Sequence, residues 1–317
     1  MSLIKASELA YCRLRVPDFA LAEQFLNDFG LVTTHRTQDA VYLRGTDPMQ
    51  YCYVLEKGEP HFLGFALHAK SEEDIQLVAT TFECPIDEID APGGGRCVRL
   101  REPNGYDIDV VFGIADADPI ELERQPLNTG TQPLLRAGKL MRLPKGKPTP
   151  VKRLAHVVMG SSLIQETTSW FQDTLGLIPS DEIYAGGGSE RTKIGAFMRV
   201  DEGAKYVDHH AFFVIRSPRS GLAHISFEAQ DLDGVLADNF YLRTLNKYEH
   251  IWGIGRHLLG SQIYDYWLDP FGYVHEHWSD TDRLNADAPT TQWDAEDGLC
   301  NQWGDPSPDR LRECVKP

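Results

Sequence analysis

Two histidines and one carboxylate, each in a separate predicted strand, are the residues of this chain best suited to bind a metal ion: His156, His224 and Glu276. Two imidazoles and one carboxylate on one face of a site match the ligand set that holds non-haem Fe(II) and leaves coordination positions open. Glu276 follows a tight turn in a strand rich in aromatic residues, where an unpaired core-facing carboxylate costs several kcal/mol. The sequence therefore predicts a cation beside Glu276, held by residues from three distant segments.

The two histidines that flank Glu276 are not predicted to belong to this site. Successive side chains of a strand face opposite ways, so Val274 and Trp278 share the side of Glu276, whereas His275 and His277 face away from it. We therefore expect His275 and His277 to be bystanders on the outer side of the strand.

An internal duplication gives the metal set its context. At matching strand positions the first half carries Tyr11, Gly64 and Asp109, so both histidines occur in the second half alone. A single strand histidine is more often a buried structural residue, but the joint difference between two aligned halves favours a metal site. The alignment places residues 9–12 over 154–157, 63–67 over 223–227, and 102–105 over 269–272.

The elements that must position these residues form two similar units. Each half is predicted to contain two modules in which a strand, a helix and further strands follow one another. This pattern predicts an α+β fold in four segments. They are a first domain over 1–114, a proline-rich linker over 115–150, a second domain over 151–280, and a tail or lid over 281–317. An insertion over 241–260, before the final strand, marks the second domain as the working copy.

Composition narrows the classes of partner. The chain has 317 residues, a net charge of −16 and a pI near 5.1, which argues against nucleic acid or an anionic membrane as partner. No apolar run reaches the roughly 20 residues of a membrane span, and the start lacks the features of a signal peptide. Six scattered cysteines fit free thiols in a reducing compartment. A cytoplasmic protein with a small-molecule partner is expected.

The whole chain resembles the type I extradiol ring-cleaving dioxygenases of the vicinal oxygen chelate superfamily. The resemblance rests on His156 in a first strand, on the strand Gly-Leu-Ala-His-Ile-Ser-Phe that carries His224, and on the ten-residue spacing from Tyr266 to Glu276. It implies two domains of paired βαβββ modules, with the metal in the C-terminal domain only. It also implies Fe(II) as the metal, with Mn(II) as an alternative, O2 as co-substrate, a small aromatic diol as substrate, and a homo-oligomer.

The same resemblance assigns roles to further residues. Tyr266 is expected to hydrogen-bond a substrate oxygen, and His257, nine residues before it, is expected to orient the substrate or donate a proton. An acid–base histidine is expected on the strand before His224, where the pair His209 and His210 supplies two candidates that face opposite ways. We predict His209, because relatives with a similarly short return loop favour the longer interval, and keep His210 as the alternative.

The predicted activity is Fe(II)-dependent extradiol cleavage of a catechol. A substituted single-ring catechol or trihydroxybenzene, such as trihydroxytoluene, is favoured, with two-ring diols as the alternative. Two other functions stay open on the same fold, namely a glyoxalase-type metal-dependent isomerase or lyase and a non-catalytic aromatic-binding protein. Four aromatic side chains are candidates for the substrate pocket: Phe197, Phe213, Trp252 and Trp267.

Overall fold

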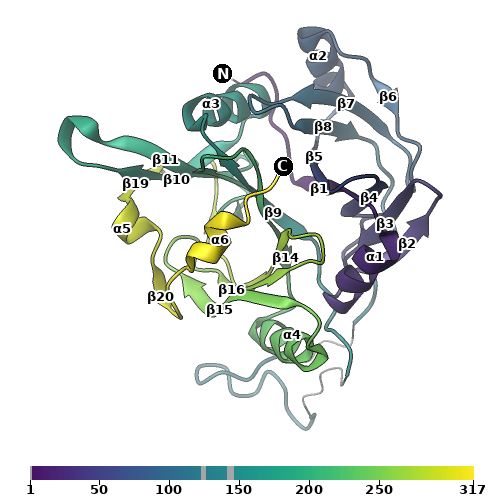
Figure 1. Cartoon of the computed structure of the whole chain (residues 1–317), viewed down its shortest axis with the longest axis vertical. Helices are drawn as coiled ribbons and strands as arrows, with labels where there is room; N and C mark the ends of the chain where they lie inside the picture. Colours follow the sequence, from purple (N-terminus) through teal and green to yellow (C-terminus); the bar gives the residue numbers. More distant parts are fainter. Residues whose placement is uncertain (1, 123–125, 141–145) are drawn as a thin grey trace.

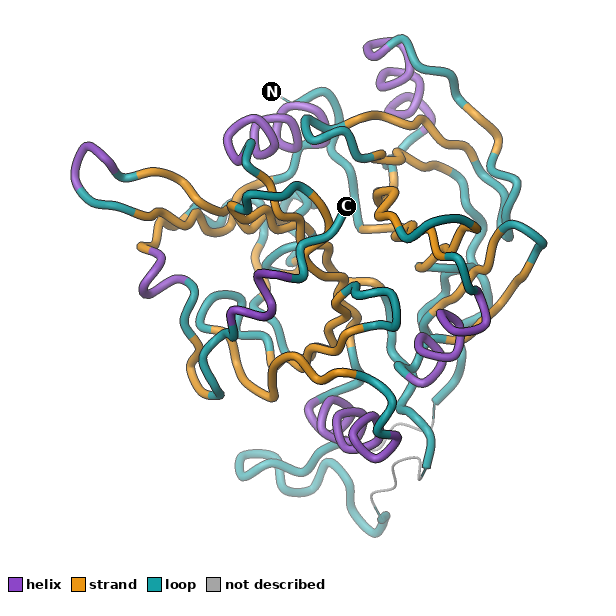
Figure 2. Tube along the Cα trace, in the orientation of Figure 1, coloured by secondary structure: helices purple, strands orange, loops and turns teal. Residues whose placement is uncertain are grey.

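The computed structural model of the chain describes residues 2–122, 126–140 and 146–317, and its strands form two large mixed sheets (Figures 1 and 2). Met1 lies outside the described residues, and so does Pro144, which belongs to the predicted linker. In the described part of the chain, no helix is long and apolar enough to cross a membrane. The described linker residues contain no helix or strand.

The first sheet has eight strands in the order β2-β3-β4-β1-β5-β8-β7-β6. The strands are β1 Leu9–Val16, β2 Val32–Arg36, β3 Ala40–Arg44, β4 Tyr53–Lys57, β5 His61–His68, β6 Asp87–Glu88, β7 Arg96–Arg101 and β8 Asp107–Phe112.

The second sheet has ten strands in the order β19-β10-β11-β13-β9-β14-β17-β16-β15-β20. A separate small sheet pairs β12 Val207–Asp208 with β18 Arg283–Leu284. The strands of the second sheet are β9 Leu154–Ser161, β10 Ile178–Ala185, β11 Thr192–Arg199, β13 Phe212–Arg216, β14 Gly221–Glu228, β15 Glu249–His257, β16 Ile263–Leu268, β17 Val274–Ser279, β19 Thr291–Asp294 and β20 Asn301–Trp303.

Both sheets are built from the same repeated module. In the first sheet β1 pairs parallel with β4 and antiparallel with β5, and β5 pairs parallel with β8. The second sheet repeats this pattern, with β9 parallel to β13 and antiparallel to β14, and with β14 parallel to β17. The predicted α+β fold of paired βαβββ modules is confirmed. The exact domain boundaries stay a prediction, although the first sheet ends at Phe112 and the second begins at Leu154.

Several helices begin or end at capping residues. The side chain of Asp18 accepts a hydrogen bond from the backbone N–H of Leu21 and begins α1, and Ser71 caps α2 in the same way. Gly176 ends α3 in the left-handed conformation that glycine tolerates best. The helices are α1 Phe19–Asp28, α2 Glu72–Phe82, α3 Ile164–Leu175, α4 Leu232–Leu245, α5 Ala295–Gly298 and α6 Asp309–Glu313, with a 3₁₀ turn at Gly188–Glu190.

Two parts of the predicted architecture were wrong. The sequence analysis missed β2, an edge strand whose side chains are nearly all exposed, because such a strand has no apolar alternation. The stretch 241–260, interpreted as an insertion, contains the end of α4 and the nine-residue strand β15. The corresponding strand of the first sheet, β6, has two residues, so the second half has lengthened a strand.

As expected, His275 and His277 face away from Glu276 on the outer side of the strand, and this outer side is buried. Both are fully buried where the outer face of β17 packs against α1 of the first domain. The ring of His277 stacks on Phe29 at 3.6 Å and its Nε2 donates to the Phe29 carbonyl at 2.7 Å. The Tyr53 hydroxyl lies 3.0 Å from Nε2 of His275. The two histidines therefore join the domains.

Acid is expected to loosen this interface. Burial lowers the pKa of His275 to about 3 and that of His277 to about 4, whereas each takes up a proton near pH 6.5 in an unfolded chain. Between these values the unfolded chain binds more protons, so stability is lost as pH falls below about 6.5, by up to about 1.4 kcal/mol per pH unit for each histidine. Urea unfolding from pH 7 to 4.5 should show a smaller pH slope for His277→Gln than for the unaltered protein. An equal slope would contradict this, and exposed His35→Gln is the control.

The C-terminal tail packs along the second sheet. Strand β19 pairs with β10, β20 pairs with β15, and Lys316 bridges to Leu222 of β14. Cys314 lies in an apolar cluster with Trp252 and Tyr266, and Val315 in another with Phe213. The tail therefore covers part of the face that carries the candidate metal ligands; opening and closing as a lid stays a prediction.

Candidate metal centre

Three adjacent strands bring the predicted ligands together. The ligand atoms of His156, His224 and Glu276 all lie within 4.8 Å of one another. Nε2 of His156 is 2.9 Å from Oε2 of Glu276, and Nε2 of His224 is 3.5 Å from the same oxygen. This is the only group of three or more such residues among the described residues.

Strand register explains how residues so far apart in sequence meet. Ser226 of β14 is paired with His156 of β9 on one side and with Glu276 of β17 on the other. His224 lies two residues before Ser226 and so shares its face of the sheet. The three ligand side chains therefore project from neighbouring strands into the same space.

The buried environment of Glu276 is one in which a bound cation would stabilise the carboxylate. Glu276 is fully buried, and no donor among the described residues is aligned to hydrogen-bond either of its oxygens. Burial alone would raise the pKa of Glu276, but the neighbouring imidazoles, His156 foremost, hold it well below its ordinary value. Burial lowers the pKa of His156, so this imidazole is neutral and able to bind a metal. The residues present therefore fit a divalent metal ion.

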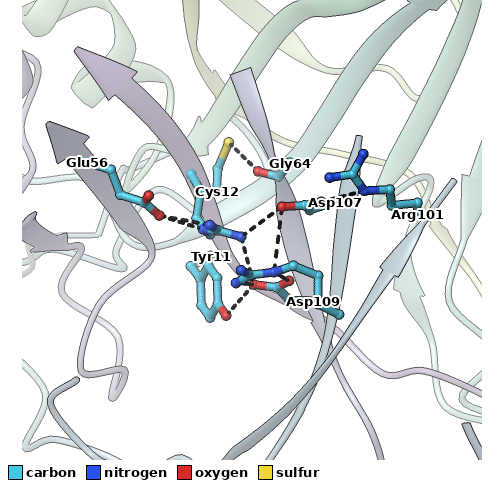
Figure 3. Close-up of polar contacts among 9 residues, drawn as sticks. Tyr11, Cys12, Glu56, Gly64, Arg101, Asp107 and Asp109 are labelled. Carbon is cyan, nitrogen blue, oxygen red and sulfur yellow. Dashed lines mark hydrogen bonds and ion pairs between the residues drawn. The ribbon is translucent and has the colours of Figure 1, made fainter. Parts of the chain in front are cut away.

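The matching position of the first sheet is filled by the protein itself (Figure 3). Asp109 is paired with Ala66 as Glu276 is paired with Ser226, so the register supports the alignment of the halves. The hydroxyl of Tyr11 donates to Oδ2 of Asp109 at 2.9 Å. Arg13 and Arg99 form ion pairs with the same carboxylate at 3.2 and 2.7 Å. Arginines thus satisfy Asp109, whereas no arginine or lysine among the described residues pairs with Glu276.

Tyr266 and His257 border the candidate centre. Tyr266 is the direct cross-strand partner of Glu276, and its hydroxyl lies 3.0 Å from Nε2 of His257. Burial, with the charge of Glu276, raises the pKa of Tyr266 well above its ordinary value, so its hydroxyl keeps its proton. Nε2 of His257 is 3.8 Å from Oε1 of Glu276. His257 ends strand β15, and is therefore part of the sheet and not of a surface loop.

The histidine pair is arranged differently from the sequence-based choice. His210 packs against His156, with ring centroids 4.2 Å apart, whereas the ring of His209 turns away toward Asp181. Nδ1 of His209 and Nδ1 of His210 are 3.0 Å apart. Burial, then the neighbouring His156, lowers the pKa of His210 well below its ordinary value. The structure therefore places His210 beside the ligands and His209 behind it.

Three of the four predicted pocket aromatics lie on this side of the sheet. Phe197 packs against His210 at 4.9 Å and stacks on Phe213 at 3.8 Å, and Trp252 stacks on Tyr266 at 5.3 Å. Trp267 does not belong here, because it is next to Tyr266 on β16 and so points to the opposite face, into the core between the domains.

Comparisons with known proteins agree on the fold. No protein-family model matches the chain. Metapyrocatechase 2 of Cupriavidus necator is 28% identical over 304 residues, which cover 93% of this chain and 88% of the relative. The chain is thus similar to the extradiol ring-cleaving dioxygenases. Homoprotocatechuate 2,3-dioxygenase from Arthrobacter globiformis is 19% identical to this chain with a TM-score of 0.79, and the alignment covers 100% of this chain and 93% of that one.

A further similar structure has a different name. The Mn(II)-bound glyoxalase from Novosphingobium aromaticivorans has a TM-score of 0.78 and 21% identity, and the alignment covers 97% of this chain and 94% of that one. At this identity the similarity shows the vicinal oxygen chelate fold alone. Among the described residues of this chain, the candidate ligands all lie in the second domain.

Sequence reasoning missed two buried polar residues of the site. Ser226 lies between His156 and Glu276 across the strands, and its hydroxyl has no hydrogen-bond partner among the described residues. Asp181 lies on β10 and contacts His209. The internal alignment holds a signal for Ser226, since its counterpart is Ala66, but nothing in the sequence pairs Asp181 with His209.

Proposed function

We propose that this chain is a metal-dependent extradiol dioxygenase that cleaves the ring of a catechol. The observation that carries the proposal is the fully buried Glu276, whose oxygens have no aligned donor, beside the two imidazoles of His156 and His224. We assign these three residues as ligands of Fe(II), with Mn(II) as the alternative. When bound, such an ion supplies open coordination positions at which a diol and dioxygen exchange electrons.

The residues around the ligands suit a catechol. His210 lies next to His156 and is positioned to accept a proton from a diol hydroxyl, so we assign it as the acid–base residue in place of His209. The Tyr266 hydroxyl keeps its proton and can donate to a substrate oxygen, while His257 holds that hydroxyl in place. Phe197 and Trp252 provide apolar walls for a ring.

The similar proteins support a substrate class for this chain. We propose a substituted single-ring catechol or trihydroxybenzene, with trihydroxytoluene as one candidate and two-ring diols as the alternative. The relatives named metapyrocatechase and homoprotocatechuate 2,3-dioxygenase support a catechol-type substrate. We further propose that the enzyme acts in the cytoplasm as a homo-oligomer, which sedimentation of the purified protein tests.

One experiment separates this function from its rivals. Protein purified without oxygen and loaded with Fe(II) or Mn(II) is mixed with a panel of catechols in air, while oxygen uptake and the yellow ring-opened product are followed. Turnover that requires both metal and oxygen supports the proposal. The same protein is also tested with a thiol adduct in the absence of oxygen. Turnover there would favour a glyoxalase-type isomerase, the alternative suggested by the similar Mn(II)-bound glyoxalase. Binding of catechols without turnover would favour a binding protein.

Tyr266→Phe is expected to lower kcat/KM for the best catechol about 10- to 100-fold, because one hydrogen bond to a buried partner is lost, worth about 1–3 kcal/mol. Metal content should not change, since Tyr266 is not a ligand. Tyr264→Phe is the matched control on the same strand, because its hydroxyl has no partner among the described residues. Steady-state kinetics and metal analysis check both variants, and equal rates for Tyr266→Phe and the unaltered enzyme would remove Tyr266 from the site.

A further inference from the structure

Asp181, His209 and His210 form a hydrogen-bonded chain that leads away from the metal ligands. Oδ2 of Asp181 lies 2.6 Å from Nε2 of His209, and Nδ1 of His209 lies 3.0 Å from Nδ1 of His210. All three side chains are buried, with exposed fractions of 6%, 3% and 3%. These three hydrogen-bonded side chains are therefore shielded from water, and each N–H hydrogen of the two imidazoles has to reside on a definite nitrogen.

Asp181, the carboxylate of this hydrogen-bonded series, is held by the C-terminal tail. Oδ1 of Asp181 accepts hydrogen bonds from the Thr291 hydroxyl and from the Trp293 indole N–H, both on β19. Burial alone would raise the pKa of Asp181, but the hydrogen bonds that it accepts outweigh burial and lower the pKa below its ordinary value. Asp181 is therefore ionised and acts only as an acceptor.

Because Asp181 is an acceptor, it determines which nitrogens of His209 and His210 carry hydrogen. Because Asp181 can only accept, Nε2 of a neutral His209 carries the hydrogen and its Nδ1 does not. Nδ1 of His209 must then accept a hydrogen bond from Nδ1–H of His210. The remaining ring nitrogen of His210, Nε2, is left without a hydrogen and is free to act as a base.

The backbone is shaped for this contact. Gly260 has a φ of +74°, and a Cβ at this position would lie 3.0 Å from Nδ1 of His209. The hydroxyl of Ser180 donates to the carbonyl oxygen of His209 at 2.6 Å, and the His209 N–H donates to the carbonyl of Asp282. His209 is thus held on its backbone as well as on its ring.

We propose that Asp181 is a positioning residue which, through His209, fixes the tautomer and ring orientation of His210. The inference rests on the proposed function in so far as His210 is the acid–base residue of the reaction. It gives the histidine pair two distinct roles, with His210 facing substrate and His209 transmitting the orientation. It also gives the tail a role, since Thr291 and Trp293 determine which oxygen of residue 181 faces His209.

Asp181→Asn tests this assignment sharply. The two donors on β19 keep the amide oxygen of the asparagine on their side, so that its NH2 group faces His209. That NH2 donates to Nε2 of His209, which places a hydrogen on Nδ1 of His209 and another on Nε2 of His210. Both rings are thereby expected to change tautomer while the fold is kept.

The first readout needs no turnover. Nitrogen-15 NMR of histidine-labelled, metal-free protein distinguishes the two neutral tautomers. We expect Nδ1–H at His210 in the unaltered protein and Nε2–H in Asp181→Asn. Glu182→Gln is the matched control on β10, because Glu182 pairs with Lys193 and not with the histidines, and it should leave both tautomers unchanged. Unchanged tautomers in Asp181→Asn would overturn the proposal whatever reaction the enzyme catalyses.

The second readout is kinetic. Asp181→Asn is expected to lower kcat on a simple catechol by about 10²- to 10⁴-fold, the range of general acid–base catalysis, with little change in KM. The loss should be much smaller on nitrocatechol, whose acidic hydroxyl needs no base, and an equal loss on both substrates would refute the positioning role. If Asp181→Asn does not fold, His209→Ala serves instead, with mixed His210 tautomers expected and a single unchanged tautomer counting against the proposal. Failure of every catechol to react would refute the proposed function and leave the NMR result to stand by itself.

Discussion

Glu276→Gln is expected to remove stoichiometric metal binding and, with it, oxygen uptake on catechols. The substitution keeps the shape of the side chain and removes the one carboxylate of the group formed by His156, His224 and Glu276 among the described residues. Loss of one member of a buried charged set typically costs about 3–5 kcal/mol, which corresponds to a roughly 10²- to 10⁴-fold loss of affinity. Metal analysis after dialysis and calorimetric titration with Mn(II) measure it directly.

The duplicated half offers a matched control for this variant. Asp109→Asn changes the acid at the equivalent position of the first sheet, where arginines and Tyr11 occupy the surroundings. It is expected to lower the free energy of unfolding, since it uncouples buried ion pairs, while the metal content stays at that of the unaltered protein. Full metal content in Glu276→Gln, or metal loss in Asp109→Asn alone, would show that the ion binds elsewhere.

Phe29→Ala is expected to have the largest effect on stability, about 3–5 kcal/mol, because a fully buried aromatic ring is replaced by a cavity. The ring lies at the end of α1, stacked on His277, and so supports the strand that carries Glu276 from behind. Metal affinity should weaken as well, since β17 loses packing on one face. Urea unfolding and Mn(II) titration measure the two effects.

The comparison for Phe29→Ala is a residue on the same helix. Leu21 is 42% exposed, so Leu21→Ala should change the free energy of unfolding by no more than about 0.5 kcal/mol. A similar small change in Phe29→Ala would mean that α1 does not bind the two domains together.

That His156, His224 and Glu276 come together could be predicted from the sequence because the duplication supplied its own reference. Tyr11, Gly64 and Asp109 showed what the same strand positions contain without a metal, and the period of two settled which side of β17 Glu276 faces. The acid–base histidine could not be settled in this way. Alternation shows that His209 and His210 face opposite sides, but which of them meets His156 depends on how neighbouring strands are paired.

What covers the outer face of β17, which carries His275 and His277, could not be predicted from the sequence either. A strand pattern tells that His275 and His277 point away from Glu276, yet the covering helix α1 lies about 250 residues earlier in the chain, as the contact between Phe29 and His277 shows. Trp267 was misplaced for the same reason, since an aromatic side chain fits a substrate pocket and a domain core equally well. Contacts between domains depend on packing, which local periodicity does not describe.

The ion pairs around Asp109 make the two halves of the chain unequal in what they require from the cell. Arg13 and Arg99 are part of the polypeptide, so the first domain is charge-balanced as soon as it is synthesised. Among the described residues no arginine or lysine pairs with Glu276, so in the proposed function its counter-charge is a metal ion taken from the surroundings. With the ligands proposed above, the first half matures by folding alone, whereas the maturation of the second half also requires a supply of metal.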